Sequence, residues 1–276
     1  MGDDLWSHAC IVSDTGAVPE LVVRLRAAGC VFAEDEAAVL LESAGSAEEL
    51  EAMVVRREAG EPLEHVVGWV DLAGVRVSID PGVFVPRQRT AFLVERAAAR
   101  LDGLDHPPVV LDLGCGTGAL ALALARTLPP GGVTVHAVDL DPAAVACAAR
   151  NLADIPGAVH LGDLTETLPA ELAGRVDVIL ANMPYVPTAA IGLMPPESRD
   201  FEPTVTVDGG SDGLDLVRRV AGLASYWLVP GGSVWVETGA DQAEAAADAF
   251  GRAGLTPAIH TDDERGATVV SAISPR

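Results

Sequence analysis

The stretch VVLDLGCGTGALALALA, residues 109–125, has the pattern of a buried strand, a glycine-rich turn and a helix. Gly114, Gly116 and Gly118 permit a tight turn and let a ligand approach the backbone closely. Asp139 follows at the expected end of the next strand, where a carboxylate accepts hydrogen bonds from ribose hydroxyls. The pattern therefore predicts a site for a nucleoside-containing cofactor.

Strand-like and helix-like segments alternate around this turn from about residue 90 onward. The apolar runs are PVVLDL, VTVHAVDL, AVHL, VDVILA, GSVWVET and TVVSAI. Helical patterns lie between them in ALALALARTL, PAAVACAARNLA, LDLVRRVAGLASYWL and QAEAAADAFGRAG. Such alternation is typical of a mostly parallel sheet covered by helices on both faces. We therefore expect an α/β, doubly wound, Rossmann-like fold whose ligand binds beyond the carboxyl ends of the strands.

The N-terminal part has the pattern of three short amphipathic helices. PELVVRLRAAG and EDEAAVLLESAG each end at a glycine, and SAEELEAMVVRREAG opens with Ser46 and Glu49 at the spacing of a capping box. WVDLAGVRVSI then alternates apolar and polar residues around Gly74, which is typical of a β-hairpin. The sequence thus predicts a helical recognition domain, a hairpin connector and a cofactor-binding catalytic domain, at residues 1–66, 67–82 and 83–276.

The composition narrows the classes of function. Hydrophobic residues make up 49% of the chain and aromatic residues only 4%, so Ala, Val and Leu must fill a sizeable core. The net charge of −22 repels phosphate backbones and disfavours nucleic acid as a partner. No apolar run reaches the roughly 20 residues of a membrane helix. Acidic residues also stand where a signal peptide is positively charged, so we expect a cytoplasmic protein without a membrane partner.

The cysteines and histidines show no metal-binding pattern. The cysteines are widely spaced, without a C-x-x-C pair, and are interpreted as small buried residues: Cys10, Cys30, Cys115 and Cys147. The histidines likewise lack the spacing of metal ligands. We expect neither a disulfide framework nor a metal site.

A second stretch, VDVILANMPYVPT at residues 176–188, changes from a buried strand to a turn that faces the cofactor in the expected topology. An amide or aromatic amine nitrogen is a poor nucleophile because its lone pair is delocalised. The Asn182 side-chain oxygen and the Met183 carbonyl are placed to accept hydrogen bonds from its two N–H groups and to hold it in line with a methyl group. Pro184 directs Met183 towards an extended conformation, and Tyr185 offers a flat face to the planar acceptor. If the cofactor is a methyl donor, the turn is therefore suited to methylation of a planar nitrogen.

The glycine turn alone leaves the cofactor open. Gly114, Gly116 and Ala119 also satisfy the dinucleotide pattern G-x-G-x-x-G/A. Asp112 precedes the turn, and D-x-G-x-G-x-G resembles the first motif of class I S-adenosylmethionine (SAM) methyltransferases. The resemblance implies that Asp163, after the third strand, contacts adenine, although an aspartate there also suits a helix cap. Asn-Met-Pro-Tyr similarly resembles the N-P-P-Y motif of methyltransferases that act on planar nitrogens.

Longer segments carry a more specific resemblance. They are RREAGEPLEHVVGWVDLAGVRVSIDPGVFVPRQRTAFLVE at residues 56–95, RDFEPTVTVDGGSDGLD at residues 199–215, and the late VPGGSVWVETGADQAEA. They resemble HemK/PrmC-type protein-(glutamine-N5) methyltransferases, from about residue 34 to the C-terminus. The resemblance implies a helical N-terminal domain beside a SAM domain, SAM as cofactor and S-adenosyl-L-homocysteine as product. It also implies a protein partner, a class I peptide release factor methylated on the glutamine of its Gly-Gly-Gln loop.

The same resemblance implies roles for individual residues, and we expect the chain to act as a monomer. The catalytic group comprises Asn182, Met183, Pro184 and Tyr185. The cofactor-binding group comprises Asp112, Gly114, Cys115, Gly116, Gly118, Asp139, Leu140, Asp163, Leu164, Asn182, Phe84 and Arg87. The substrate-binding group comprises Pro86, Glu202 and Pro203. Two alternatives stay open, in which Phe84 is simply a buried strand residue and Arg87 a surface charge.

The chain departs from the family pattern at several positions. Met183 replaces the first proline of N-P-P-Y, which keeps the carbonyl but removes some rigidity. Gln88 and Arg89 stand where a proline and an acid are usual, and His65 replaces a tyrosine. These departures indicate a divergent member whose acceptor is a release factor, another protein glutamine or a smaller amide.

Three further interpretations are compatible with the sequence. The first keeps the chemistry and takes a nucleic-acid base amine as acceptor. The second is an NAD-linked oxidoreductase that uses the glycine turn, which leaves Asn182 to Tyr185 unexplained. The third is a SAM-binding or partner-binding module that has lost transfer activity.

Overall fold

The computed structural model describes residues 17–275 and divides the chain into two compact units. One unit extends to Trp69 and includes Pro195–Phe201, and the other comprises Val70–Met194 and the residues from Glu202 onward. This division differs from the sequence-based boundaries. Most of the hairpin belongs to the larger unit, and a short segment far along the chain belongs with the N-terminal helices.

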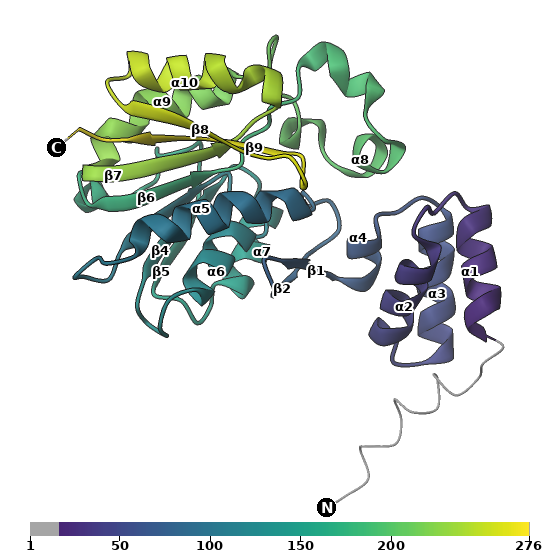
Figure 1. Cartoon of the computed structure of the whole chain (residues 1–276). Helices are drawn as coiled ribbons and strands as arrows, with labels where there is room; N and C mark the ends of the chain where they lie inside the picture. Colours follow the sequence, from purple (N-terminus) through teal and green to yellow (C-terminus); the bar gives the residue numbers. More distant parts are fainter. Residues whose placement is uncertain (1–16, 276) are drawn as a thin grey trace, which may run out of the picture. The chain divides into compact units, whose positions relative to one another are not determined.

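Helices build the smaller unit. They are α1 (Ala17–Ala27), α2 (Ala33–Ser43), α3 (Ala47–Glu58), α4 (Leu63–Val67) and α8 (Pro196–Phe201), labelled in Figure 1. Buried side chains from the first four pack into a core of their own, among them Leu21, Leu25, Leu40, Val54 and Val66. The pattern of three helices is present at α1 to α3. The sequence did not predict α4 and α8, which have 5 and 6 residues and are too short to show a helical period.

The start of α3 follows the predicted capping signal. The Ser46 hydroxyl accepts a hydrogen bond from the Glu49 backbone N–H at 3.1 Å. The Glu49 carboxylate in turn accepts from the backbone N–H of Gly45 at 2.8 Å. Two N–H groups at the helix start thus find side-chain partners, with the reciprocal bond one residue before Ser46.

Arg57 connects α8 to the other helices of the smaller unit. It lies on α3 and is buried, and its guanidinium pairs with Glu36 on α2 and Glu197 on α8 at N–O distances of 2.6 and 2.5 Å. A buried guanidinium requires such partners. The pair with Glu197 joins α8 to α3, and Pro195–Phe201 belongs to the same unit as these helices.

A β-hairpin, β1 (Trp69–Leu72) and β2 (Val75–Ser78), follows the N-terminal helices in the chain. Its turn residues Ala73 and Gly74 have φ values of 51° and 77°. Two consecutive positive φ angles are typical of the tight turn whose twist matches that of paired strands. The hairpin predicted around Gly74 is therefore confirmed.

A seven-stranded sheet forms the larger unit. Its strands are β3 (Val109–Leu113), β4 (Thr134–Asp139), β5 (Gly157–Leu161), β6 (Val176–Ala181), β7 (Leu228–Glu237), β8 (Thr256–Asp262) and β9 (Ala267–Ile273). Their order is β5-β4-β3-β6-β7-β9-β8. β3 to β7 run parallel, and β9 is antiparallel to both β7 and β8. The strand order reverses at β3, between β4 and β6, which is where sheets of this class bind ligands.

Helices cover both faces of this sheet (Figure 1). They are α5 (Ala91–Leu101), α6 (Ala119–Arg126) and α7 (Pro142–Asn151) on one face, and α9 (Asp215–Trp227) and α10 (Ala243–Arg252) on the other. Neighbouring residues of β3 serve the two cores, since Val110 packs with α5 to α7 and Leu111 with α9 and α10. The predicted α/β, Rossmann-like class is therefore confirmed.

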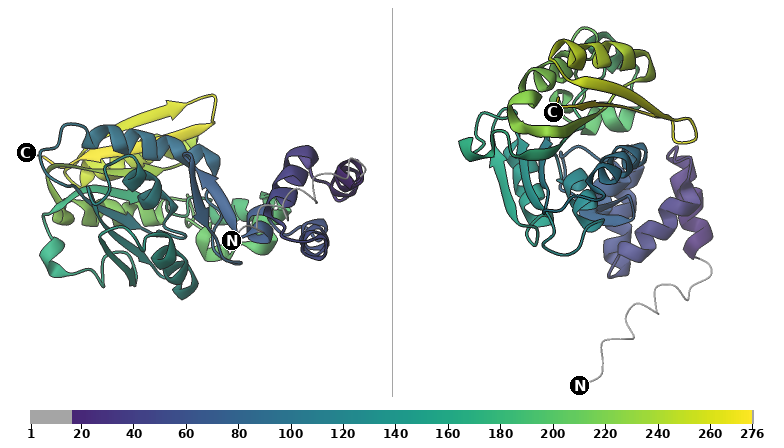
Figure 2. Two further views of the ribbon diagram at one scale, coloured as in Figure 1. Left: turned by 90° about the horizontal axis from the view of Figure 1, so that it is seen from below. Right: turned by 60° about the vertical axis from the view of Figure 1, so that its left-hand side comes forward.

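The sequence did not predict β8 and α5. β8 lies at the edge of the sheet beside β9, and Figure 2 shows the two strands, in yellow, as a long hairpin. Edge strands need no continuous apolar run, and β8 is largely exposed and contains Pro257. α5 follows a short turn at Gln88–Thr90, and its buried residues Leu93, Val94 and Ala97 face the sheet.

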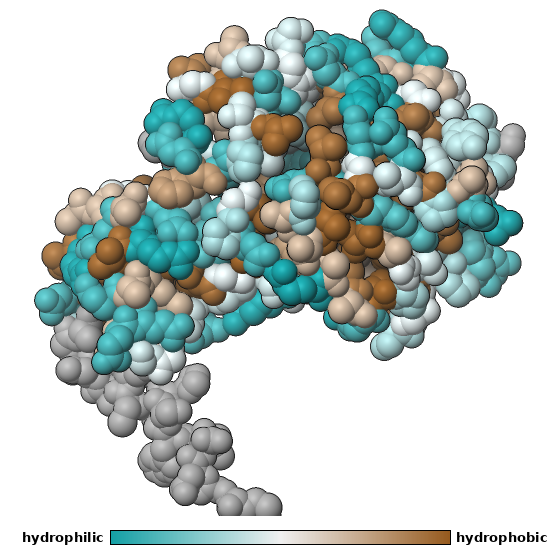
Figure 3. Space-filling model, turned by 180° about the vertical axis from the view of Figure 1, so that it is seen from behind, coloured by the Kyte–Doolittle hydropathy of each residue, from teal (hydrophilic) through white to brown (hydrophobic). Residues whose placement is uncertain are grey.

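The surface of the larger unit carries hydrophobic as well as hydrophilic residues. Figure 3 shows one face of the protein, on which hydrophobic residues (brown) gather among hydrophilic ones (teal) over the larger unit. In the described range no helix is long and apolar enough to cross a membrane, and no group of three or more metal-ligating side chains is suited to a metal ion. Cys30, Cys115 and Cys147 are buried free thiols, whereas Cys10 lies outside the described residues.

Gly118 gives a prediction about stability. It begins α6 with a φ of 75°, and an added Cβ would lie 3.2 Å from Ala148 and Leu152 on the α7 side. We expect Gly118→Ala to lower the free energy of unfolding by about 1–3 kcal/mol, because the left-handed backbone strains any side chain and the added Cβ would crowd Ala148 and Leu152. Chemical denaturation measures this change.

Gly131→Ala is the matched control for Gly118→Ala. Gly131 has a similar φ of 71°, but an added Cβ would meet nothing within 4 Å. Its variant should therefore lose only the part of the stability that backbone strain accounts for. Equal losses in the two variants would show that the close approach of α6 to α7 contributes nothing.

Candidate active site

A cavity of about 640 Å³ opens in the larger unit at the carboxyl ends of β3 to β6. Its wall includes residues at or just beyond the end of each of these four strands, among them Gly114, Asp139, Gly162 and Asn182. The volume lies within the range of roughly 300–1,000 Å³ that is usual for sites that hold small organic ligands. The cavity therefore occupies the place where the strand order predicts a cofactor.

Most of the residues proposed from the sequence line this cavity. They are Phe84, Pro86, Gly114, Cys115, Gly116, Asp139, Leu140, Asp163, Leu164, Asn182, Met183 and Pro184. The rest are not among its lining residues: Arg87, Asp112, Gly118, Tyr185, Glu202 and Pro203. The structure thus brings nine of the twelve predicted cofactor residues and three of the four residues of the tetrapeptide to one cavity.

Asp139 and the glycine loop hold each other in place. The two carboxylate oxygens of Asp139 accept hydrogen bonds from the backbone N–H groups of Gly116 and Asp141, at 2.8 and 2.9 Å. Gly116 has a φ of 52°, and a Cβ added there would meet no atom within 4 Å. The backbone at Gly116 therefore borders open space beside a fixed carboxylate. This arrangement suits a ligand with a ribose, because the remaining lone pairs of Asp139 accept hydroxyl protons.

Asp112 supports the glycine loop from beneath. Its carboxylate is buried and accepts a hydrogen bond from the backbone N–H of Ala121, in the first turn of α6, at 3.2 Å. Burial raises the pKa of Asp112 from its ordinary value of 3.8 to about 7, and the nearby charge of Asp139 acts in the same direction. The pKa of the Cys115 thiol is raised as well, chiefly by burial, so Cys115 lines the cavity as a protonated thiol.

The raised pKa of Asp112 predicts a pH-dependent stability. The folded state favours the protonated carboxyl, so the associated stability is fully present below about pH 3.8 and is lost as the pH rises through about 7. Asp112→Asn removes the titration and keeps an oxygen for the Ala121 N–H. Relative to this variant, we expect the wild type to lose on the order of 3 kcal/mol of unfolding free energy between pH 5 and pH 8. Denaturation curves at both pH values measure the unfolding free energies. The same change between pH 5 and pH 8 in both proteins would contradict the prediction.

Asp163 lies on the cavity wall with a cationic neighbour. Its carboxylate pairs with the guanidinium of Arg219, on α9, at 2.9 Å, and both residues line the cavity. The adjacent Leu164 has a φ of 51°, an uncommon conformation for a branched side chain. Leu140, also on the wall, remains largely exposed and offers an apolar surface.

Arg87 and Glu202 brace the segment that carries Phe84 and Pro86 to the cavity. The Arg87 guanidinium donates to both carboxylate oxygens of Glu202, at 2.7 and 2.6 Å, and lies 5.0 Å from the centre of the Phe84 ring. Glu202 also accepts from the backbone N–H of Val85 at 3.3 Å. Arg87 is therefore an internal ion-pair partner, which differs from the alternative of a simple surface charge.

Met183 fills the space beneath the glycine loop. It is 3% exposed, and a Cβ added at Gly114 would lie 2.7 Å from the Met183 Cε. The flexible thioether thus occupies the room that the missing side chain at Gly114 leaves. The segment beyond it is fixed by its own bonds, since the Tyr185 carbonyl accepts from the Gln242 side chain at 2.8 Å.

The Tyr185 hydroxyl contacts a polar cluster made of the buried Glu237 and the partly exposed Arg89. It donates to the Glu237 carboxylate at 2.8 Å and accepts from the Arg89 guanidinium at 2.6 Å. Arg89 also donates to Glu237 at 2.9 Å. Burial, together with the charge of Glu237, raises the pKa of Tyr185, so the phenol stays protonated. In this arrangement Tyr185 supports the turn from behind, whereas the sequence predicts that its ring packs on the acceptor.

Sequence reasoning missed Thr90 and Glu237. Thr90 is fully buried and donates its hydroxyl proton to Glu237 at 2.6 Å, and the Asn182 amide nitrogen lies 3.5 Å from the same hydroxyl. Both residues fall in segments, PRQRTA and VWVETG, that contributed to the family resemblance. The signal that could have identified Glu237 is an acidic residue at the end of an apolar, strand-like run.

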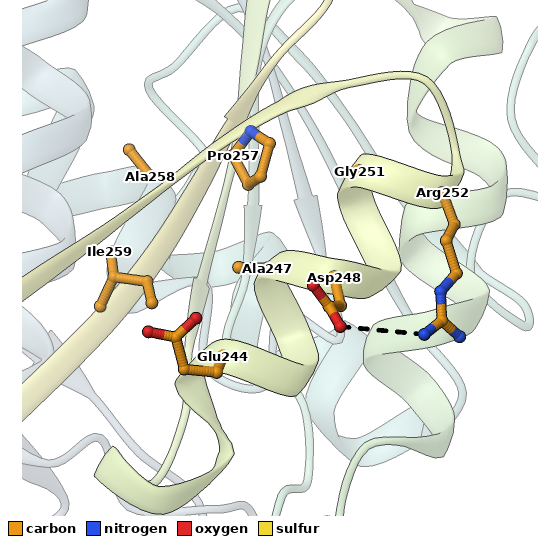
Figure 4. A pocket seen from close by; sticks show the side chains of 8 residues that line it. All are labelled: Glu244, Ala247, Asp248, Gly251, Arg252, Pro257, Ala258 and Ile259. Carbon is orange, nitrogen blue, oxygen red and sulfur yellow. Dashed lines mark ion pairs between the residues drawn. The ribbon is translucent and has the colours of Figure 1, made fainter.

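A second hollow, of about 540 Å³, lies between α10 and β8 (Figure 4). It is more open to solvent, and its charged groups include the pair Asp248 and Arg252, 3.8 Å apart. It shares no lining residue with the cavity at the strand ends. None of the predicted cofactor and transfer residues lines this second hollow.

The chain matches known methyltransferases. Residues 110–193 match the family model described as a methyltransferase domain. The chain is 39% identical over 216 residues to a release factor glutamine methyltransferase of Geobacter sulfurreducens, which covers 78% of this chain and 73% of the relative. It is 40% identical over 205 residues to the enzyme of the same name from Bordetella pertussis, with 74% of each chain covered.

Solved structures agree on the fold. A 16S rRNA methyltransferase of T. thermophilus, determined with AdoMet and guanosine, superposes with a TM-score of 0.54 at 24% identity, over 75% of this chain and 49% of that one. These matches leave the NAD-linked interpretation without support, and the cofactor is SAM. The loop geometry and the relatives lead to the same conclusion: this chain belongs to the family of release factor glutamine methyltransferases, and it is a SAM-dependent N-methyltransferase.

Proposed function

We propose that the chain methylates the side-chain amide nitrogen of the glutamine in the Gly-Gly-Gln loop of a class I peptide release factor. The observation that carries the proposal is that Asn182, Met183 and Pro184 line the same cavity as Asp139 and Gly116. The relatives from Geobacter sulfurreducens and Bordetella pertussis, both named release factor glutamine methyltransferases, support this choice of acceptor.

The residues present fit SAM, which when bound supplies a methyl group on a positively charged sulfur. Asp139 binds ribose hydroxyls, and Gly116 lets the ligand approach the backbone, because its missing side chain leaves open space. Leu140 and Leu164 provide apolar surface on the same wall. Asp163, held by Arg219, is the acceptor we propose for the adenine amine.

Asn182 and Met183 act on the acceptor amide. The Asn182 side-chain oxygen and the Met183 backbone carbonyl accept hydrogen bonds from its two N–H groups and hold the nitrogen at the methyl group. Both oxygens carry partial negative charge, so they stabilise the positive charge that develops on the nitrogen during transfer. Once the nitrogen carries the methyl group it is strongly acidic and releases one of its two protons to solvent, so the step requires no strong general base. The protonated Tyr185, bonded to Glu237, is consistent with a supporting role.

We further propose that the protein acts in the cytoplasm as a monomer and without nucleic acid as its partner. The net charge of −22 supports the last point, since it repels phosphate. Light scattering of the purified protein, alone and with RNA added, tests the oligomeric state and the partner together. A stable dimer or a complex at physiological salt would contradict these proposals.

The test of the proposed function is an intact-mass assay of methyl transfer. Purified protein and SAM are incubated separately with the host's class I release factors and with total RNA. We expect a gain of one methyl group on the release factor and none on RNA. Methylated RNA with an unchanged release factor would instead favour a base amine as acceptor. SAM binding without transfer to either would favour a catalytically silent module.

A further inference from the structure

Glu237 is a buried acceptor at the end of β7, behind the cavity wall. It is 1% exposed, and both of its oxygens are engaged. One accepts from the Arg89 guanidinium and the Tyr185 hydroxyl, at 2.9 and 2.8 Å, and the other accepts from the Thr90 hydroxyl at 2.6 Å. The guanidinium offsets the negative charge of the buried carboxylate. A carboxylate only accepts hydrogen bonds, so Glu237 fixes the direction of each of these bonds.

The bond to Glu237 leaves Thr90 only its acceptor capacity. A hydroxyl has one proton, and in Thr90 that proton is given to Glu237. Thr90 is completely buried, and its oxygen lies 3.5 Å from the Asn182 amide nitrogen. The only hydrogen bond that suits this pair is one in which the Asn182 NH₂ donates to Thr90. The contact is long, as catalytic contacts often are before ligands bind.

The direction of that bond sets the orientation of the Asn182 amide. An asparagine side chain presents NH₂ and oxygen on opposite branches of a planar group, and the two are interchangeable by a half turn. When NH₂ is turned to Thr90, the oxygen takes the other branch, and Asn182 lines the cavity. An oxygen there accepts a hydrogen bond from the N–H of the acceptor amide, whereas an NH₂ group there would place two donors against each other.

We propose that Thr90 is a positioning residue, which together with Glu237 turns the Asn182 side-chain oxygen towards the cavity. The expected effect of Thr90 on turnover, unlike its effect on the orientation of Asn182, depends on the proposed function. Thr90 is not a lining residue of the cavity, so it acts through Asn182 and touches neither cofactor nor acceptor. Loss of its hydroxyl should leave SAM binding unchanged and slow the transfer step.

Selective labelling tests the orientation without any assay of activity. The chain contains only two asparagines, Asn151 and Asn182. Asparagine labelled with ¹⁵N in the side chain therefore gives two NH₂ signals, of which Asn151 is the internal control, since its amide donates to the Ser78 and Thr117 carbonyls. We expect Thr90→Val to move the Asn182 signals only, and Thr90→Ser to leave both pairs in place. An unmoved Asn182 pair in folded Thr90→Val would overturn the inference.

The kcat values of Thr90 variants test whether the orientation of Asn182 matters for methyl transfer. We expect Thr90→Val to lower kcat by about 10- to 100-fold, as for a misplaced catalytic group, with the SAM dissociation constant within about 2-fold of wild type. Thr90→Ser should restore kcat to within about 3-fold. In an Asn182→Ala background, Thr90→Val should have no further effect, because the two residues act in series. Equal kcat in Thr90→Val and wild type, or additive losses in the double variant, would overturn the role.

The two proposals fail in different ways. If the wild type transfers no methyl group to a release factor, the proposed function fails, while the asparagine signals still decide the orientation of Asn182. If Thr90→Val does not fold, which the Asn151 signals report, Thr90→Ala carries the same comparison with Thr90→Ser. An intact release-factor activity with an unmoved Asn182 signal would refute the inference alone.

Discussion

Asn182→Ala is expected to abolish nearly all methyl transfer while the protein still binds SAM. The variant loses the side-chain oxygen that holds one N–H of the acceptor amide and stabilises the charge on its nitrogen. Removal of a comparable preorganised group costs enzymes about 100- to 1,000-fold in kcat. Single-turnover transfer to the release factor measures this loss, because it reports the chemical step without product release.

SAM affinity and folding are the controls for Asn182→Ala. The contacts of Asp139 with Gly116 and Asp141 do not involve Asn182, so the SAM dissociation constant should stay within about 2-fold of wild type. An unchanged melting temperature would show that the cavity is intact. Transfer near the wild-type rate would contradict the role of Asn182, and a parallel loss of SAM binding would make it a cofactor residue.

Asp139→Ala is expected to weaken SAM binding more than any other single change on the wall. The variant loses hydrogen bonds to the ribose. It also leaves the backbone N–H groups of Gly116 and Asp141 without the carboxylate acceptor that holds the glycine loop in place. Charged hydrogen bonds of this kind contribute about 1–3 kcal/mol, so the dissociation constant should rise about 5- to 150-fold. Isothermal titration calorimetry with SAM measures the change.

Asp141→Ala is the matched control for Asp139→Ala. Asp141 is in the same loop and also lines the cavity, but its carboxylate caps α7 by accepting from the Ala143 N–H at 2.9 Å. Its loss should lower stability by about 1 kcal/mol and leave SAM binding closer to wild type. Equal losses of affinity in the two variants would move the ribose contact away from Asp139.

The sequence predicts most of the sheet because its central strands are buried on both faces. β3, β4 and β6 are apolar runs that end in chemically distinctive residues, and parallel topology then places Asp139 and Asn182 at one edge. β8 escaped prediction because an edge strand has one exposed side and little pattern. The sequence did not predict α8, because its six residues pack with helices more than a hundred residues earlier in the chain.

In the site, too, local sequence patterns predict some residues, whereas others are brought together only by the fold. The residues that line the cavity come from strand ends, which local patterns locate. The cluster behind it joins Arg89 and Thr90 to Glu237, and such pairings across the chain follow only from the fold. Arg89 illustrates this limit, since the sequence marks it as a departure from the family and the structure shows its carboxylate partner.

The departure at Met183 also has a physical account in the structure. The family pattern has a proline at this position, which restricts the backbone. Here the methionine side chain is buried against Gly114 beneath the glycine loop. Packing of the side chain thus restrains the backbone whose carbonyl is proposed to bind the acceptor. The lost rigidity of the ring is replaced by a contact with the cofactor loop.

The central claim is that this chain methylates a glutamine amide nitrogen in a release factor. The most direct measurement is peptide mass analysis of the Gly-Gly-Gln loop after incubation with the wild-type protein and SAM. It uses two release factors, one natural and one with glutamate in place of the loop glutamine. We predict one added methyl group on the glutamine and none on the glutamate variant. An unmodified glutamine with measured SAM binding, or equal methylation of both factors, would contradict the account.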